Sequence, residues 1–148
     1  MQALLTEVRE LRQSIQAMTV SSQRVRILIF NLQMQDAAVS RSSQRLNEAK
    51  TRCSAIESRR RSDDAAIQHV ESDVASGKLG PNQTKELQAN TLAEVKRMLD
   101  LETADLQTCR VAESEAESQV RNDQAKLADA QEKIDRLEKE LDKAAAGK

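Results

Sequence analysis

Apolar residues recur at every seventh position through the first half of the chain. The series runs from Leu4 to Val74, and only Arg60 interrupts it. A strict period of seven predicts a long helix that supercoils left-handed around a partner helix. We expect this helix over about 3–76. Further apolar residues accompany this series. Near the start of the chain they lie four positions after a member of the series, at Val8, Ile15 and Ile29, and later they lie three positions after one, at Ala49, Ile56 and Val70.

A stretch with Gly77, Gly80 and Pro81 ends this pattern, and a second heptad pattern follows it. Glycine adopts the left-handed conformation that ends a helix, and proline suits the first position of the next one. The second pattern predicts a helix over about 82–145. Two amphipathic helices joined by a short turn at 77–81 predict an all-α fold, a long antiparallel two-helix coiled-coil hairpin that forms one domain over 1–148.

The two cysteines test the register of this hairpin. Facing residues of an antiparallel hairpin lie equally far from the turn, and Cys53 and Cys109 are equally far from Pro81 along the chain. Both also lie on the apolar stripes of their helices, at a separation that a disulfide can span. We therefore predict an interhelical disulfide. The alternative is two free buried thiols, which a reducing cytosol would impose.

Two charged residues interrupt the stripes at facing positions. Arg60 and Glu102 are also equally far from Pro81, so the same register brings them together. The sequence therefore predicts an ion pair between them inside the seam.

The N-terminal part of the chain carries more apolar residues than one hairpin can cover. The register places Lys148 opposite Ser14, so the first residues extend past the second helix. The stretch RVRILIFNLQM is apolar on more than one face. We expect an oligomer interface, with a dimer favoured and a four-helix bundle within residues 4–34; the alternative is a locally wider core with incidental surface residues. The expected interface residues are Leu4, Val8, Leu11, Ile15, Ile27, Phe30 and Met34.

Composition narrows the possible functions. The chain of 148 residues has one Phe, no Trp and no Tyr, and its net charge is −1, which argues against a compact globular core and against nucleic-acid binding by bulk charge. The single histidine, His69, is far from both cysteines, so we expect no metal or cofactor site. No phosphate loop or nucleophile motif occurs, and no run is long enough to cross a membrane; we expect neither catalysis nor a membrane span.

The stretches LLTEVRELRQSIQ and RVRILIFNLQMQ resemble uncharacterised exported coiled-coil proteins of bacteria. This resemblance implies no activity, but it implies a location outside the cytoplasm. We expect a periplasmic or secreted protein whose export signal has been removed, with a cytoplasmic location as the alternative.

These observations lead to three hypotheses about function. The first is a structural or scaffolding protein whose two helices are joined by the disulfide and that self-associates through residues 4–34. The second is a protein-binding adaptor that docks a different protein on the same apolar segment. The third is a cytosolic coiled-coil fragment of a larger machine, with reduced thiols.

Overall fold

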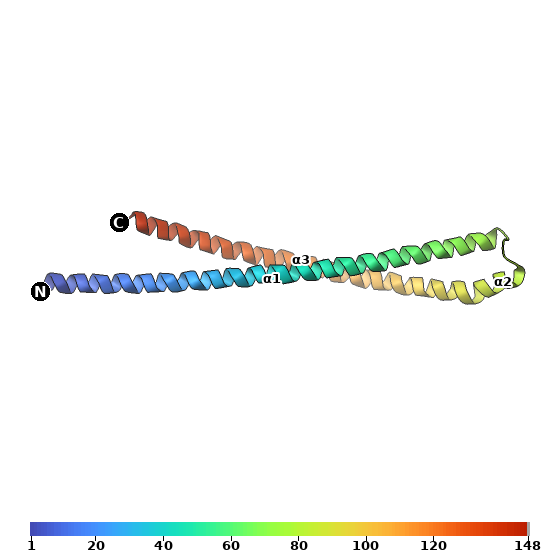
Figure 1. Cartoon of the computed structure of the whole chain (residues 1–148), viewed down its shortest axis with the longest axis horizontal. Helices are drawn as coiled ribbons and strands as arrows, with labels where there is room; N and C mark the ends of the chain where they lie inside the picture. Colours follow the sequence, from blue (N-terminus) through green and yellow to red (C-terminus); the bar gives the residue numbers. More distant parts are fainter. Residues whose placement is uncertain (148) are drawn as a thin grey trace. The chain divides into compact units, whose positions relative to one another are not determined.

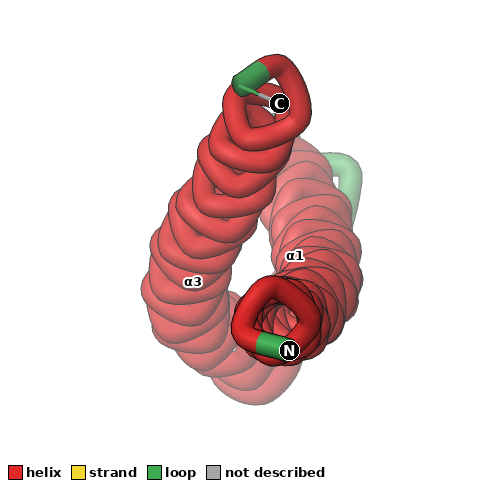
Figure 2. Tube along the Cα trace, turned by 90° about the vertical axis from the view of Figure 1, so that its left-hand side faces the viewer, coloured by secondary structure: helices red, strands yellow, loops and turns green. Residues whose placement is uncertain are grey.

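The computed structural model describes residues 1–147, and Figure 1 shows that helices make up nearly all of them. Loops remain only at the chain ends and at the connection between the long helices (Figure 2), and no strand occurs in this described part. The predicted all-α helical hairpin is confirmed, whereas the four-helix bundle involves a second copy and stays a prediction. The expected pairing of Lys148 with Ser14 lies outside the described residues. The helices are α1 (Gln2–Ala75), α2 (Pro81–Glu86), the π-helical segment η1 (Leu87–Thr91) and α3 (Leu92–Ala146).

The chain divides into two compact units, and the boundary between them falls inside both long helices. The first unit contains Met1–Ser42 and Val120–Lys148, and the second contains Ser43–Gln119. The heptad pattern runs through both boundaries and does not indicate this division. The second unit holds the turn and both cysteines, and the first unit holds the N-terminal apolar residues.

In the second unit, α1 ends in a Schellman motif built on Gly77. The backbone N–H of Lys78 donates to the carbonyl of Asp73 at 3.3 Å, and the N–H of Gly77 donates to the carbonyl of Val74 at 3.3 Å. Gly77 has a φ of 70°, the left-handed conformation that this motif requires at the residue after the helix. The chain then begins α2 at Pro81, where the missing N–H costs nothing.

Replacing Gly77 by alanine is expected to lower the free energy of unfolding by about 1 kcal/mol, because an L side chain is strained at positive φ. The added methyl group would meet no atom within 4 Å, so no steric clash adds to this strain. Urea unfolding with the disulfide intact measures it. Gly80→Ala is the matched control, since Gly80 has no positive φ and its added methyl group would meet only Gln83 Oε1 at 4.0 Å. Equal losses in the two variants would contradict this account of the turn.

In the first unit, one flank of the α1 stripe faces α3 and the other remains exposed. Leu28, three residues after Val25, is half-buried, whereas Ile29 is 44% exposed. The prediction that Ile29 belongs to the seam is therefore wrong, because residues three and four positions on lie on opposite flanks of a stripe. The most buried residues of α3 in this unit are Ala130, Asp123 and Leu137.

Candidate functional site

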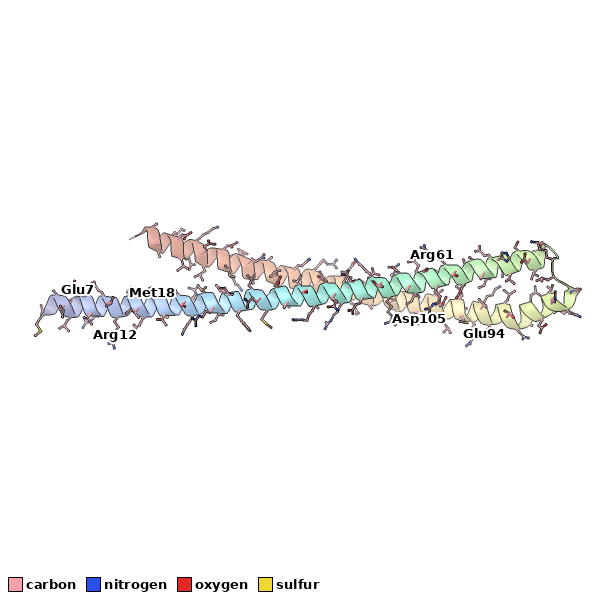
Figure 3. The ribbon with its side chains drawn as sticks, viewed as in Figure 1. Glu7, Arg12, Met18, Arg61, Glu94 and Asp105 are labelled. Carbon is pink, nitrogen blue, oxygen red and sulfur yellow. A yellow bond between two sulfur atoms is a disulfide. The ribbon has the colours of Figure 1, made fainter. Side chains whose placement is uncertain are left out.

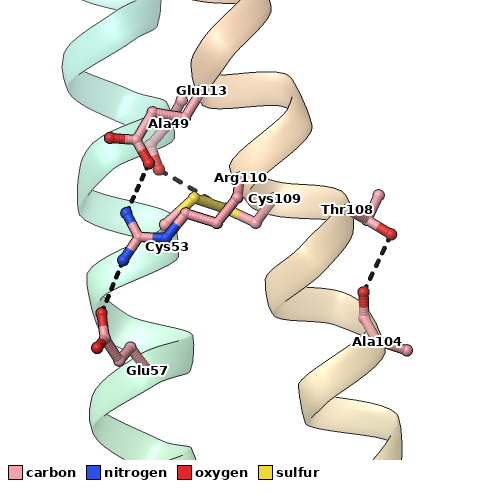
Figure 4. The surroundings of a disulfide bond; sticks show 8 residues. All are labelled: Ala49, Cys53, Glu57, Ala104, Thr108, Cys109, Arg110 and Glu113. Atoms are coloured by element: carbon pink, nitrogen blue, oxygen red, sulfur yellow. Dashed lines mark hydrogen bonds and ion pairs between the residues drawn. A yellow bond between two sulfur atoms is a disulfide. The ribbon is translucent and has the colours of Figure 1, made fainter.

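Cys53 of α1 and Cys109 of α3 form the predicted disulfide in the second unit (Figure 4). Their Cα atoms are 5.6 Å apart, and both side chains are buried in the seam. The Sγ of Cys109 also lies 3.8 Å from the carbonyl oxygen of Ala49. This is a packing contact, because a disulfide sulfur has no proton to donate. The alternative of two free thiols is therefore not what the structure contains.

Charged side chains bridge the two helices beside the disulfide. Arg110 of α3 donates through Nη2 to Glu57 of α1 and through Nη1 to Glu113 of its own helix, each at 2.8 Å (Figure 4). The hydrogen bond and charge of Glu113, and then those of Glu57, raise the pKa of Arg110 above its ordinary value. The guanidinium therefore fixes one flank of the interface as well as the orientation of a seam carboxylate.

The same flank carries two further ion pairs at heptad spacing. Lys50 pairs with Glu117 at 3.8 Å, and Lys96 pairs with Glu71 at 2.7 Å. These two pairs and the Glu57–Arg110 pair share one midpoint along the chain, between residues 83 and 84. Three independent contacts therefore agree on one antiparallel register for the second unit. Sequence reasoning missed them, although their positions beside the two stripes are where coiled coils place interhelical ion pairs.

Arg60 and Glu102 lie in the seam, but no ion pair joins them within the described part of the chain. Arg60 Nε and Glu102 Oε2 are both buried without a hydrogen-bond partner. Glu102 instead interacts with the carboxylate of Asp63, while the guanidinium of Arg59 supplies the nearby positive charge. Burial raises the pKa of Glu102 above its ordinary value, the charge of Asp63 raises it further, and Arg59 opposes both. The seam therefore contains a partly buried carboxylate beside Asp63 and Arg59, where the sequence predicted a simple pair with Arg60.

The raised pKa of Glu102 predicts a pH-dependent contribution to stability. Because the folded state holds the proton more tightly than the unfolded state, this contribution is complete below the ordinary glutamate pKa of 4.5 and is lost as the pH rises through the folded value. Glu102→Gln is therefore expected to raise the thermal unfolding midpoint at pH 7, and the gain should shrink toward pH 4. Circular dichroism across this range measures both midpoints.

Glu115→Gln removes the same charge from the exposed surface of α3 and serves as the control for this experiment. Its effect should be small and should not follow the titration of Glu102. A gain from Glu102→Gln that stays constant between pH 4 and pH 7 would contradict the assignment.

The seven residues of the predicted oligomer interface are all exposed, with exposed fractions between 48% and 68%. Every residue of α1 up to Val20 is exposed as well. Two groups can be distinguished within this surface. The N-terminal strip consists of Leu4, Val8, Leu11, Ile15 and Met18, and the outer patch consists of Ile27, Phe30 and Met34.

The strip and the outer patch lie on different faces of α1. The strip consists of residues of the heptad stripe and of residues four positions after them. These later residues lie on the flank of α1 that α3 leaves exposed at Ile29. The outer patch begins two residues after Val25 of the stripe and so lies on the far side of the helix. The first unit therefore presents apolar side chains in two directions.

The fold and the site together define a disulfide-linked, all-α helical hairpin with an exposed apolar N-terminal surface. No protein-family model matches the sequence, and comparisons with curated proteins and with solved structures gave no match. Within residues 1–147, no helix combines the length and the apolar character needed to cross a membrane. The same residues contain no cluster of three or more His, Cys, Asp or Glu side chains that could hold a metal ion.

Proposed function

We propose that this chain is a structural protein that self-associates through its apolar N-terminal segment, and that the N-terminal strip is the dimer interface. The observation that carries the proposal is the exposure of the heptad stripe from Leu4 to Met18, on a helix whose stripe is half-buried farther along at Val25 and Leu32. Apolar residues repeated at this spacing are the signature of a surface that packs on another helix. Within residues 1–147, no other segment covers this part of α1.

Helix energetics support this proposal. A helix in a protein obtains most of its stability from the packing of its apolar face. Residues 2–20 of α1 are all exposed, so no packing against another segment of residues 1–147 stabilises them. A partner that covers the strip removes apolar surface from water at about 25 cal/mol for each Å².

A second copy of the chain is the partner that we propose. A dimer with twofold symmetry requires a surface that is complementary to itself, and a strip of aliphatic side chains at heptad spacing meets this requirement. The half-buried segments near Val25 and Leu32 follow directly after the strip. Two hairpins joined along the strip would bring four helices together at these half-buried segments. This arrangement is the four-helix bundle expected from the sequence.

The disulfide supports a location in an oxidising compartment, such as a periplasm or the cell exterior. There the bond holds the hairpin closed while the N-terminal surface makes the assembly. In this proposal the protein is a connecting or scaffolding element, and its function lies in association and not in catalysis.

Light scattering over a range of protein concentrations tests the self-association. The expected mass is twice that of the 16.5 kDa chain. A mass of one chain at millimolar concentration would overturn the proposal and would leave a different protein as the occupant of the surface, as in the adaptor hypothesis.

A further inference from the structure

The N-terminal strip contains two kinds of apolar residue in alternation. Val8 and Ile15 are β-branched and occupy one heptad position, a, while Leu4, Leu11 and Met18 are unbranched at Cβ and occupy the other, d. In parallel coiled coils, β-branched residues at a together with leucine at d favour two strands. The strip therefore has the residue pattern of a parallel two-stranded coiled coil.

Glu7 and Arg12 flank the strip on its two sides. Figure 3 shows that the two side chains project from different sides of α1. Both residues are exposed, and neither forms an ion pair within residues 1–147. They are five residues apart, which is the spacing that joins opposite flanks of two parallel helices. A parallel partner in the same register therefore brings Glu7 beside Arg12 of the second copy, and does so twice by symmetry.

An antiparallel partner pairs the same flanks differently, and the hairpin shows how. In the second unit, residues on the same flank of the two helices meet, as Glu57 meets Arg110. Cys53 and Cys109 are equally far along the chain from Pro81, whereas the midpoint between Glu57 and Arg110 lies two to three residues after Pro81. The same geometry applied to an antiparallel dimer with Val8 against Leu11 places Arg12 against Arg12 and Glu7 against Glu7 of the second copy. Like charges at such positions are repulsive.

The next antiparallel register avoids this repulsion but gains no attraction. It places Glu7 against Ser14 and Arg12 against Thr19 of the second copy. Of these arrangements, only the parallel one forms ion pairs between the flanking charges. It also packs each apolar residue of the strip against the same residue of the second copy.

We propose that residues 4–18 of two copies form a parallel, in-register, two-stranded coiled coil, flanked by ion pairs between Glu7 and Arg12 of the second copy. This inference rests on the proposed self-association and adds its direction and register. In such a dimer each residue of the paired segment faces the same residue of the second copy.

Cysteine cross-linking of the full chain tests the direction. Leu4→Cys and Met18→Cys are made separately, and each is oxidised with glutathione and run on a non-reducing gel, with the native Cys53–Cys109 disulfide left in place. In a parallel, in-register dimer both variants form covalent dimers, because each residue faces its own copy. An antiparallel dimer brings at most one of these two positions near its own copy. Gln13→Cys, on the outer face, is the control and should not cross-link.

Charge exchange provides a second measurement. Glu7→Arg is expected to raise the dissociation constant of the dimer about 10-fold, because two attractive flanking pairs become repulsive. The double variant Glu7→Arg with Arg12→Glu restores both pairs in a parallel dimer and should recover native affinity. The recovery distinguishes pairing from a general effect of charge.

The outcomes separate this inference from the proposed function. A native chain that is monomeric by light scattering overturns both. A dimer in which one or neither of the Leu4→Cys and Met18→Cys variants cross-links overturns the parallel arrangement alone, as does a charge exchange that fails to recover affinity.

Discussion

Replacing Cys53 and Cys109 together by alanine is expected to lower the free energy of unfolding by about 4 kcal/mol. The two cysteines are 56 residues apart in the chain, and closing a loop of this length restricts the unfolded state far more than the folded one. Alanine suits the buried site because it introduces no hydroxyl that would need a hydrogen-bond partner. Urea unfolding followed by circular dichroism measures the loss.

The composition of the seam makes this bond important. The layers beside the disulfide include the half-buried charged residues Arg60, Glu102 and Glu113, so apolar packing near it is thin. The native protein kept reduced, without alkylation, is the control for the alanine variant and should lose a similar amount. Unfolding free energies of native and reduced protein that agree within about 1 kcal/mol would show that the bond restricts the unfolded state little.

The register of the hairpin and the disulfide could be predicted from the sequence for a simple physical reason. An antiparallel hairpin has one unknown in its register, and the positions of Cys53 and Cys109 about the turn determine it. The requirement that both residues also lie on an apolar stripe is an independent condition, and both meet it. The observed disulfide confirms this prediction.

The side of the α1 stripe that faces α3 could not be predicted in the same way. The apolar pattern favoured Ile29, but the buried flank includes the polar residue Ser42, which is only 3% exposed. Its hydroxyl donates to the carbonyl of Val39 at 3.1 Å, so its burial leaves no unsatisfied donor. A prediction from the pattern of polar and apolar residues treats such a serine as a surface residue. It therefore assigns the wrong flank of α1 to the interface with α3.

The surroundings of Arg60 and Glu102 depend on side-chain conformation more than on register. Asp63 and Arg59 lie close enough to Glu102 to interact with it, and α1 supplies both. Equal distance from Pro81 along the chain places Glu102 at the correct height along the helices. It does not select among neighbouring residues one helical turn apart. Long charged side chains reach several of these neighbours, which is why the predicted pair is not the one that forms.

Leu11→Asp is expected to raise the dissociation constant of the dimer at least about 100-fold, because each copy would bury a carboxylate in the paired strip. Sedimentation equilibrium measures the change. Leu11 is 62% exposed in the single hairpin, so the variant should keep its helix content and its disulfide. Loss of the dimer with a folded hairpin therefore assigns the effect to the interface.

Gln13→Asp adds the same charge on the opposite face of α1, two residues away, and should leave the dimer nearly unchanged. Equal dissociation in the two variants would mean that added negative charge, and not the strip, weakens association. Native affinity in Leu11→Asp would remove the strip from the interface. Leu11 lies in the middle of the strip, so a parallel and an antiparallel dimer would both bury it. The variant therefore tests whether the strip is the interface, independently of the direction in which the two copies run.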